Sequence, residues 1–315
     1  MRLVFMGTPQ IAVPVLESLL VAGHYIAAVY TQPNRPAGRG RGITSSPVKL
    51  AAQSLGLPIV EPQSFKKEEE QRRLASFKPE AVVVAAYAKL LPPPVLELPR
   101  WGCINFHPSL LPRHRGAAPI PATILAGDEF GGVSIMLMNE GLDTGPVLAQ
   151  AEIPVAASDT TGSLNKKLSV VGGQLLNEVL IAWQRGEIKP RPQDDSLASN
   201  SSVIYKADGE IEWTKPAEEI WRRVRALQPW PGAFTHWQGR LLKIVEALPV
   251  PYDGKAAPGQ VLAGPLPGNL QAAFGIATGK GVLGIIKAQL EGKRVMTSEE
   301  LLRGQRQLIG VALPS

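Results

Sequence analysis

The sequence predicts an α/β protein with two domains, a mostly parallel sheet domain followed by a small β-barrel. Short apolar runs alternate with helical patterns up to residue 185, which is typical of an open parallel sheet covered by helices. Many short strand-like runs with Gly and Pro turns follow residue 204, as expected of a barrel or sandwich. The length of 315 residues also favours two domains.

Six apolar runs are expected to form the strands of the first domain, namely residues 2–6, 25–30, 81–86, 103–106, 133–138 and 147–153. Apolar side chains recur at helical spacing at Val13, Leu16 and Leu19, which predicts a helix directly after the first strand. Further helices are expected at residues 47–55, 66–77, 117–126 and 161–185.

The chain changes character at Lys189, where a Pro-rich stretch is followed by Asp, Ser and Asn. We therefore predict a catalytic domain over residues 1–188, a linker over 189–204 and a second domain over 205–315. The second domain is expected to hold helices at 216–227 and 298–303 and strands at 233–237, 241–247, 259–262, 270–277 and 281–287.

Composition excludes several classes. A hydrophobic fraction of 44% argues against a disordered chain, and no apolar run is long enough to span a membrane. The N-terminus lacks the long apolar region of a signal peptide. Cys103 is the single cysteine and there are four histidines, so neither a disulfide nor a metal cage is expected. We expect a cytoplasmic protein without a metal.

The net charge is +6, and residues 31–60 contain four basic residues, Arg35, Arg39, Arg41 and Lys49, but no acidic one. Such a patch would attract a polyanion through phosphate contacts. A solvated surface loop is the ordinary alternative. The irregular segment 32–46 is long for a compact domain, which favours a function for it.

The turn after the first strand reads Gly7-Thr8-Pro9 and lacks the G-x-G-x-x-G spacing of a dinucleotide site. The acidic residue that would bind a ribose is also missing from residues 31–60. A nicotinamide oxidoreductase is therefore disfavoured.

The most informative stretch begins with Asn105 and His107, two apart at the end of a strand and so on the same face. An amide donor beside an imidazole suits acyl transfer, since the amide can hold an oxyanion while the imidazole moves or stabilises charge. Asp143 lies downstream in a tight loop between two strands. Each residue alone is more simply explained as an ordinary strand-end or turn residue.

Taken together, these segments resemble the methionyl-tRNA formyltransferase family of folate-dependent formyltransferases over essentially the full chain. The matching segments are residues 5–9 (FMGTP), 35–40 (RPAGRG), 105–112 (NFHPSLLP), 115–120 (RGAAPI), 141–146 (GLDTGP), 229–233 (PWPGA) and 291–293 (EGK). The resemblance implies a Rossmann-like first domain, an OB-like barrel as the second, and formyl transfer from 10-formyltetrahydrofolate to the α-amino group of methionyl initiator tRNA.

The resemblance also implies residue roles. Direct attack of the amine would pass through a tetrahedral intermediate, with Asn105 donating to its oxygen, His107 assisting, and Asp143 orienting His107 and helping to take the amine proton. Cys103 is expected to be buried rather than nucleophilic. The folate site would be lined by Ser109, Leu110, Leu111, Pro112, Tyr87 and Leu91.

On the acceptor side, the resemblance implies that the loop carrying Arg35, Arg39 and Arg41 enters the tRNA acceptor stem. Basic residues of the second domain are candidates to follow the tRNA backbone: Lys206, Arg222, Arg223, Arg225, Lys287, Lys293, Arg294 and Arg303. We expect no membrane partner and a monomer.

Two alternatives stay open. A formyltransferase acting on a small amine, such as a ribonucleotide or an amino sugar, would share Asn105, His107 and Asp143 but would need neither the arginine loop nor this second domain. A nucleic-acid-binding protein on an inactive enzyme fold is disfavoured because all three of these residues are present.

Overall fold

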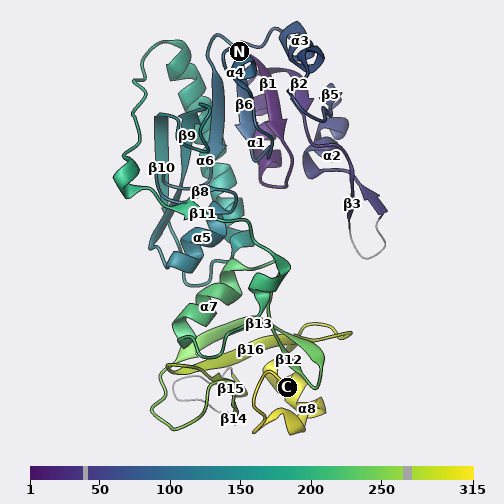
Figure 1. Ribbon diagram of the computed structural model, residues 1–315, viewed down its shortest axis with the longest axis vertical. Coiled ribbons are helices and arrows are strands. Elements are labelled where there is room, and N and C mark those ends of the chain that lie inside the picture. Colours follow the sequence, from purple (N-terminus) through teal and green to yellow (C-terminus); the bar gives the residue numbers. More distant parts are fainter. Residues whose placement is uncertain (38–41, 265–271) are drawn as a thin grey trace. The chain divides into compact units, whose positions relative to one another are not determined.

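The computed structural model describes residues 1–37, 42–264 and 272–315, which divide into two compact units (Figure 1). Unit 1 comprises Met1–Pro119, Phe130–Pro154 and Asn165–Ser202, and unit 2 comprises Ile120–Glu129, Val155–Leu164 and Val203–Ser315. Most of the predicted linker thus packs with unit 1. The boundaries expected from the sequence, at residues 189 and 205, stay a prediction.

Unit 1 is built on a seven-stranded sheet. Its strands in spatial order are β10 (Val147–Pro154), β9 (Phe130–Leu137), β7 (Cys103–His107), β6 (Ala81–Ala85), β1 (Arg2–Gly7), β2 (Tyr25–Tyr30) and β5 (Ile59–Val60). The five strands from β7 to β5 pair in parallel, and β9 pairs antiparallel with both β7 and β10, so β9 is the reversed strand of the sheet. The predicted mostly parallel sheet is confirmed. The carboxyl ends of these five parallel strands, β7, β6, β1, β2 and β5, therefore lie at the same edge of the sheet.

Helices cover both faces of this sheet. On one face, Leu74 of α3 (Glu68–Ser76) and Val95 of α4 (Pro93–Leu96) join Val4 of β1 in a buried cluster. On the other face lie α1 (Ala12–Val21) and α6 (Thr161–Gln184), linked by a hydrogen bond from Asn177 to the carbonyl of Ser18. Burial on both sides explains why β6 is apolar throughout and β1 is apolar from Leu3 to Met6.

Alternation along β7 decides which of its side chains can form a site. Cys103 belongs to the cluster on the face of α3 and α4, whereas Phe106 lies beneath Gly172 of α6. Since successive strand residues point to opposite faces, Asn105 and His107 share the face of Cys103. They lie at the carboxyl end of the strand, where ligands of open α/β sheets bind.

Shorter elements complete unit 1. The helix α2 (Pro47–Ser54) begins at Ser46, whose hydroxyl accepts a hydrogen bond from the Lys49 amide at 3.0 Å. The strands β3 (Arg35–Ala37) and β4 (Gly42–Thr44) form an antiparallel pair. The strand β8 (Arg115–Gly116) pairs in parallel with β11 (Asn200–Ser201), so a segment far along the chain returns to the region that follows β7.

The described part of unit 2 is built on an antiparallel sheet, against which the helices α7 (Ala217–Ala226) and α8 (Ser298–Gly304) pack. The strands are β12 (Ala233–Trp237), β13 (Arg240–Val250), β16 (Val282–Leu290), β15 (Phe274–Ala277) and β14 (Val261–Ala263) in spatial order, with β17 (Met296–Thr297) beside β16. The helix α7 packs Ile220 and Val224 into their core, and α8 adds Leu301. The small β-domain is confirmed, and its OB-like barrel topology stays a prediction.

Two short pieces of the N-terminal half belong to unit 2, α5 (Pro119–Ala126) apart from its first residue and the segment 155–164. Arg225 of α7 holds the second piece by donating to the carbonyl of Asp159 at 3.1 Å. Across the described ranges, none of the helices combines the length and the hydropathy that a membrane crossing requires.

Candidate active site

Asn105 and His107 lie in the last three residues of the strand β7 and are almost completely buried, with Asn105 7% exposed. Asn105 lies beside Val84 of β6 and Met136 of β9, and His107 lies opposite Ser134. Burial between two strands leaves each side chain little freedom to rotate. The strand therefore delivers an amide and an imidazole in fixed positions, as the period-2 pattern predicts.

Asp143 comes from the loop that joins β9 to β10, and this loop is tightly folded. Asn139 closes it by accepting hydrogen bonds from the Gly141 amide at 3.1 Å and the Thr144 hydroxyl at 2.9 Å. A Cβ at Gly145 would lie 1.8 Å from the carbonyl oxygen of Leu137, so only glycine fits there. Asp143 itself has a φ of 54°, a left-handed conformation that aspartate tolerates better than most residues.

The three predicted catalytic side chains come together in the structure. The Asn105 amide Nδ2 donates to Asp143 Oδ1 at 3.3 Å, and the Gly116 backbone N–H donates to Oδ2 at 2.8 Å. His107 Nδ1 lies 3.6 Å from Oδ2, too far for a direct hydrogen bond. The carboxylate is thus fixed by two donors and faces the imidazole.

The contacts of His107 determine its tautomer. Nε2 lies 3.2 Å from the carbonyl oxygen of His114, which can only accept, so Nε2 carries a hydrogen. In the neutral imidazole, Nδ1 then presents a lone pair towards Asp143 Oδ2. Because Nδ1 and Oδ2 are both acceptors and face each other, they can share one exchangeable proton, which is bound to either group or relayed by a water.

Burial lowers the pKa of His107 below its usual 6.5, although Asp143 and the His114 carbonyl act in the opposite direction. A histidine with a lowered pKa in the folded state is protonated first in the unfolded state. Its contribution to stability is therefore complete above pH 6.5 and is lost as the pH falls below that value. The neutral imidazole is the resting form at neutral pH.

We expect the imidazole of His107 to titrate with a midpoint below pH 6.5. The measurement is an NMR titration of the histidine side chains, with His107→Gln used to assign the resonance. Between pH 7 and 5 the free energy of unfolding should also fall more steeply in the unchanged protein than in His107→Gln. A midpoint at or above 6.5 would contradict the assignment of burial as the dominant influence.

The arrangement offers an oxyanion donor and a proton acceptor side by side. One N–H of the Asn105 amide is used by Asp143, and the amide has a second N–H to give. The His107–Asp143 pair can take up a proton. Cys103 is no rival nucleophile, because burial raises the pKa of its thiol to about 12. Within the described ranges, no three His, Cys, Asp or Glu side chains gather as metal ligands would.

Four of the predicted folate residues form the turn after β7. The Ser109 hydroxyl donates to the Arg113 carbonyl at 2.6 Å, and the Ser109 carbonyl accepts from Ser134 Oγ at 2.7 Å. Gln150 of β10 donates to the carbonyl of Leu111 at 2.9 Å. The Leu111 side chain is buried. Leu110 and Pro112 are half-buried. The turn is rigid, and its role in binding folate stays a prediction.

The other two predicted folate residues follow β6. The Tyr87 ring and the Leu91 side chain are buried in the cluster with Phe65, whereas Leu90 is 84% exposed. The Gln32 amide holds this loop by donating to the carbonyls of Tyr87 at 3.0 Å and Ala88 at 3.1 Å. Tyr87 and Leu91 therefore anchor the loop in the core of unit 1, and their role in binding folate stays a prediction.

Of the predicted tRNA residues in the arginine loop, Arg39 and Arg41 lie outside the described residues, and Arg35 begins β3. Four basic residues of unit 2 have acidic neighbours. Arg222 lies 3.4 Å from Glu218, Lys287 2.7 Å from Glu246, Arg294 2.7 Å from Glu300 and Arg303 3.8 Å from Glu299. Lys206 and Lys293 are exposed. A surface ion pair is weak, so these pairs do not prevent phosphate contacts.

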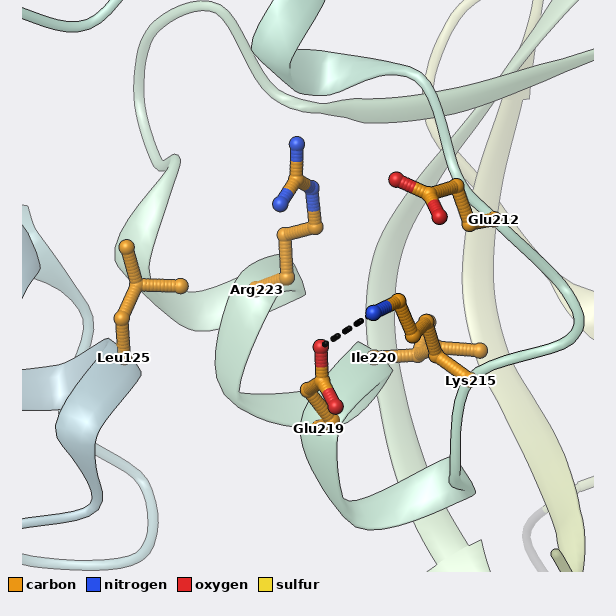
Figure 2. A pocket seen from close by; sticks show the side chains of 6 residues that line it. All are labelled: Leu125, Glu212, Lys215, Glu219, Ile220 and Arg223. Atoms are coloured by element: carbon orange, nitrogen blue, oxygen red, sulfur yellow. Dashed lines mark ion pairs between the residues drawn. The ribbon is translucent and has the colours of Figure 1, made fainter. Parts of the chain in front are cut away.

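Two further arginines of α7 have structural contacts. Arg225 is buried and lies over the Trp221 ring at 3.8 Å, and we do not propose it as a tRNA contact. Arg223 donates to the carbonyl of Asp208 and borders a pocket of unit 2 shown in Figure 2. The pocket is lined by Leu125, Glu212, Lys215, Glu219, Ile220 and Arg223. Its charges are of both signs, with Lys215 and Glu219 3.9 Å apart.

Three residues of the site escaped the sequence-based assignment of roles. Gly116 supplies an N–H to Asp143, Gln193 donates to the backbone of the loop that carries Asp143, and Arg115 donates to Gln193. Arg115 and Gly116 belong to a segment that carries the family resemblance, yet their pattern alone indicated no role. Gln193 lies in the predicted linker, where composition gives no signal of a site.

Comparison with known families matches residues 1–180 to the formyl transferase family and residues 203–306 to the formyl transferase C-terminal domain. A methionyl-tRNA formyltransferase of Dehalococcoides mccartyi is 48% identical over 99% of this chain and 98% of its own. That of Marinobacter nauticus is 42% identical, covering 98% of both chains, and that of Myxococcus xanthus is 45% identical, covering 97% of this chain and 95% of its own.

Solved structures share the fold at low identity. HypX from Aquifex aeolicus, in complex with tetrahydrofolic acid, aligns with a TM-score of 0.63 and 19% identity over 97% of this chain, which spans 47% of HypX. An N-formyltransferase from Helicobacter canadensis, in complex with folinic acid and dTDP-3-aminofucose, aligns with a TM-score of 0.64 and 19% identity over 90% of this chain and 97% of its own. Both domains of this chain match the formyl transferase family, so the chain belongs to that family, and the three relatives described above, at 42–48% identity over nearly the full chain, are methionyl-tRNA formyltransferases.

Proposed function

We propose that this protein transfers a formyl group from 10-formyltetrahydrofolate to the α-amino group of methionyl initiator tRNA, giving N-formylmethionyl-tRNA for translation initiation. The observation that carries the proposal is that the side chains of Asn105, His107 and Asp143 lie together at the end of β7. They do so in a chain that is 48% identical to a methionyl-tRNA formyltransferase over nearly its whole length. A folate-derived donor is supported by the tetrahydrofolate and folinic acid complexes of the fold relatives. We propose that the enzyme acts as a cytoplasmic monomer.

The site residues supply the two things that amine formylation needs. Asn105 donates an N–H to the oxygen of the formyl carbon as the amine adds to it, and a preorganised donor of this kind stabilises an oxyanion by about 3 kcal/mol. The neutral His107 and the Asp143 carboxylate share the proton that leaves the amine, because His107 Nδ1 faces Asp143 Oδ2. The same pair returns a proton to the folate nitrogen, so the tetrahedral intermediate, in which the new carbon–nitrogen bond is already formed, collapses by breaking the carbon–nitrogen bond to folate.

The remaining predicted residues are proposed to bind the two substrates, the folate and the tRNA. Ser109 to Pro112 and the loop after β6 form the folate side, and the apolar side chain of Leu90, exposed beside Leu91, adds to it. The basic loop with Arg35, Arg39 and Arg41 meets the acceptor stem. We propose that residues 205–315 bind the tRNA backbone, with Lys206 and Lys293 well exposed for it.

The proposal is tested by following tetrahydrofolate release with different amines. The protein is mixed with 10-formyltetrahydrofolate and with either methionyl initiator tRNA, free methionine or a nucleotide-linked amino sugar. We expect turnover with the charged tRNA alone. Equal turnover with the amino sugar would instead support a small-molecule formyltransferase on the same fold.

Replacing Arg39 by alanine should raise KM for methionyl initiator tRNA by about tenfold, because an arginine contact to a base is worth about 1–3 kcal/mol. KM for the folate should stay unchanged. The matched control is Arg72→Ala, an exposed arginine of α3 paired with Glu68 at 2.7 Å, which should alter neither constant. A rise in KM for folate, with KM for tRNA unchanged, would show that the loop serves the donor.

A further inference from the structure

Gln193 bridges the loop that carries Asp143. Its side-chain amide donates one hydrogen bond to the backbone carbonyl of Asp143 at 2.8 Å and another to the carbonyl of Gly145 at 2.7 Å. Both N–H groups of a single amide are therefore committed to one tight turn. The residue itself comes from the segment that follows α6, 50 positions beyond Asp143.

Arg115 fixes the orientation of this amide. Its guanidinium donates to Gln193 Oε1 from Nε at 3.0 Å and from Nη2 at 2.9 Å. Because a guanidinium has no acceptor, the Gln193 oxygen must face it and the NH₂ group must face the loop. Arg115 is 7% exposed and also reaches Asp195 at 2.8 Å. The contacts leave no freedom for the amide to flip.

The bridged turn holds a residue in an unfavourable conformation. Asp143 has a φ of 54°, in the left-handed region that residues other than glycine adopt rarely. In this conformation its carboxylate meets the N–H groups of Asn105 and Gly116 and faces His107. Tethering the carbonyls of Asp143 and Gly145 opposes relaxation of the turn, which would swing the carboxylate away.

The same returning segment also positions the other donor to Asp143. The backbone carbonyl of Ser201 in β11 accepts a hydrogen bond from the Ala117 N–H at 3.2 Å. Ala117 directly follows Gly116 in the chain. A Cβ at Gly116 would lie 2.5 Å from this carbonyl oxygen, and the Gly116 φ is +112°. Residues 193–201 thus support the site from two sides, and they are part of it rather than a passive connection.

We propose that Gln193, held by Arg115, is a positioning residue that sets the backbone of Asp143 for formyl transfer. This inference rests on the proposed catalytic role of Asp143. Gln193 does not touch the reacting atoms. Its contribution should therefore appear in kcat, through the placement of the Asp143 carboxylate, and not in the KM of either substrate.

The decisive variant is Gln193→Glu, which keeps the side-chain volume and an oxygen for Arg115 but removes both N–H donors. We expect kcat to fall about tenfold to a hundredfold, since small misplacements of catalytic groups have effects of this size. KM for methionyl initiator tRNA and for 10-formyltetrahydrofolate should stay within about twofold. Gln193→Met, which also lacks donors and carries no charge, should show the same loss of kcat.

The control variant is Gln71→Glu on α3, which makes the same chemical change. The Gln71 amide also donates to a backbone carbonyl of unit 1, that of Phe65 at 2.8 Å, but it supports a different loop. We expect kcat unchanged for Gln71→Glu. Melting temperatures of both Glu variants separate a loss of fold from a loss of positioning, and a kcat loss of equal size in both would overturn the proposal.

A double substitution tests whether Gln193 acts through Asp143. In the Asp143→Asn background, adding Gln193→Glu should lower kcat by less than about twofold, because groups that act as a unit are not additive. A full additional loss there, or normal kcat in both Gln193→Glu and Gln193→Met, would overturn the inference. Normal kcat in Asp143→Asn alone would instead overturn the catalytic role of Asp143 in the proposed function.

Discussion

Asp143→Asn is expected to lower kcat for formyl transfer about a thousandfold or more. A carboxylate accepts from both Asn105 and Gly116, whereas an amide has one oxygen and would set its NH₂ group against one of these donors. It would also present no base to His107. In triad enzymes, replacing the aspartate beside the histidine with asparagine lowers kcat by about 10⁴, which indicates the scale of the expected loss.

Affinity for the tRNA should stay nearly unchanged in Asp143→Asn, because the aspartate is 12% exposed and faces Asn105 and His107. Single-turnover kinetics and tRNA binding are the measurements. Asp253→Asn, at an exposed position of unit 2, is the control and should behave as the unchanged protein. Near-normal turnover in Asp143→Asn would remove this residue from the mechanism.

Asn105→Ala should reduce kcat by about 10²–10³, the usual cost of removing one oxyanion donor. The loss is expected in kcat rather than in KM, because the oxygen of the formyl group becomes a strong acceptor only as the amine adds to it. The Asp143 carboxylate also loses its contact at 3.3 Å.

A second asparagine allows a matched comparison. Asn177 of α6 donates to the backbone carbonyls of Ser18 at 3.3 Å and Gly173 at 2.9 Å, so Asn177→Ala should affect the free energy of unfolding and leave kcat unchanged. Should Asn105→Ala retain kcat while both variants lose stability alike, Asn105 would be a structural residue.

The sheet and the neighbouring pair on β7 could be predicted because local pattern determines them. The apolar run predicted at residues 103–106 is β7, and the alternation of a strand puts Asn105 and His107 on one face. The helices predicted at 47–55 and 161–185 are α2 and α6, which end one residue earlier. These elements have clear periodicity and clear ends.

The meeting of Asp143 with this pair could not be derived from pattern, since 38 positions separate it from Asn105. It came from the family resemblance. The part played by Gln193 was missed because Pro and polar residues on either side of it are typical of a linker. Its function depends on a turn 50 residues earlier, and single-chain periodicity holds no information about such a contact.

Basic residues show a similar limit. Counting charges selected Lys287 and Arg222 as tRNA candidates, but Lys287 lies across from Glu246 in the register of β13 and β16. That pairing needed the sheet register. The pair of Glu218 and Arg222 on α7 follows from helical spacing and could have been predicted.

The most direct test of the proposed function compares two acceptors. Formyl transfer from 10-formyltetrahydrofolate is measured with methionine-charged initiator tRNA and with methionine-charged elongator tRNA. Transfer to the initiator alone is the expected result, and it would establish the donor, the amine and the discrimination between tRNAs in one experiment. Folate binding without transfer to either tRNA would contradict the proposal and direct the search to a small-molecule amine.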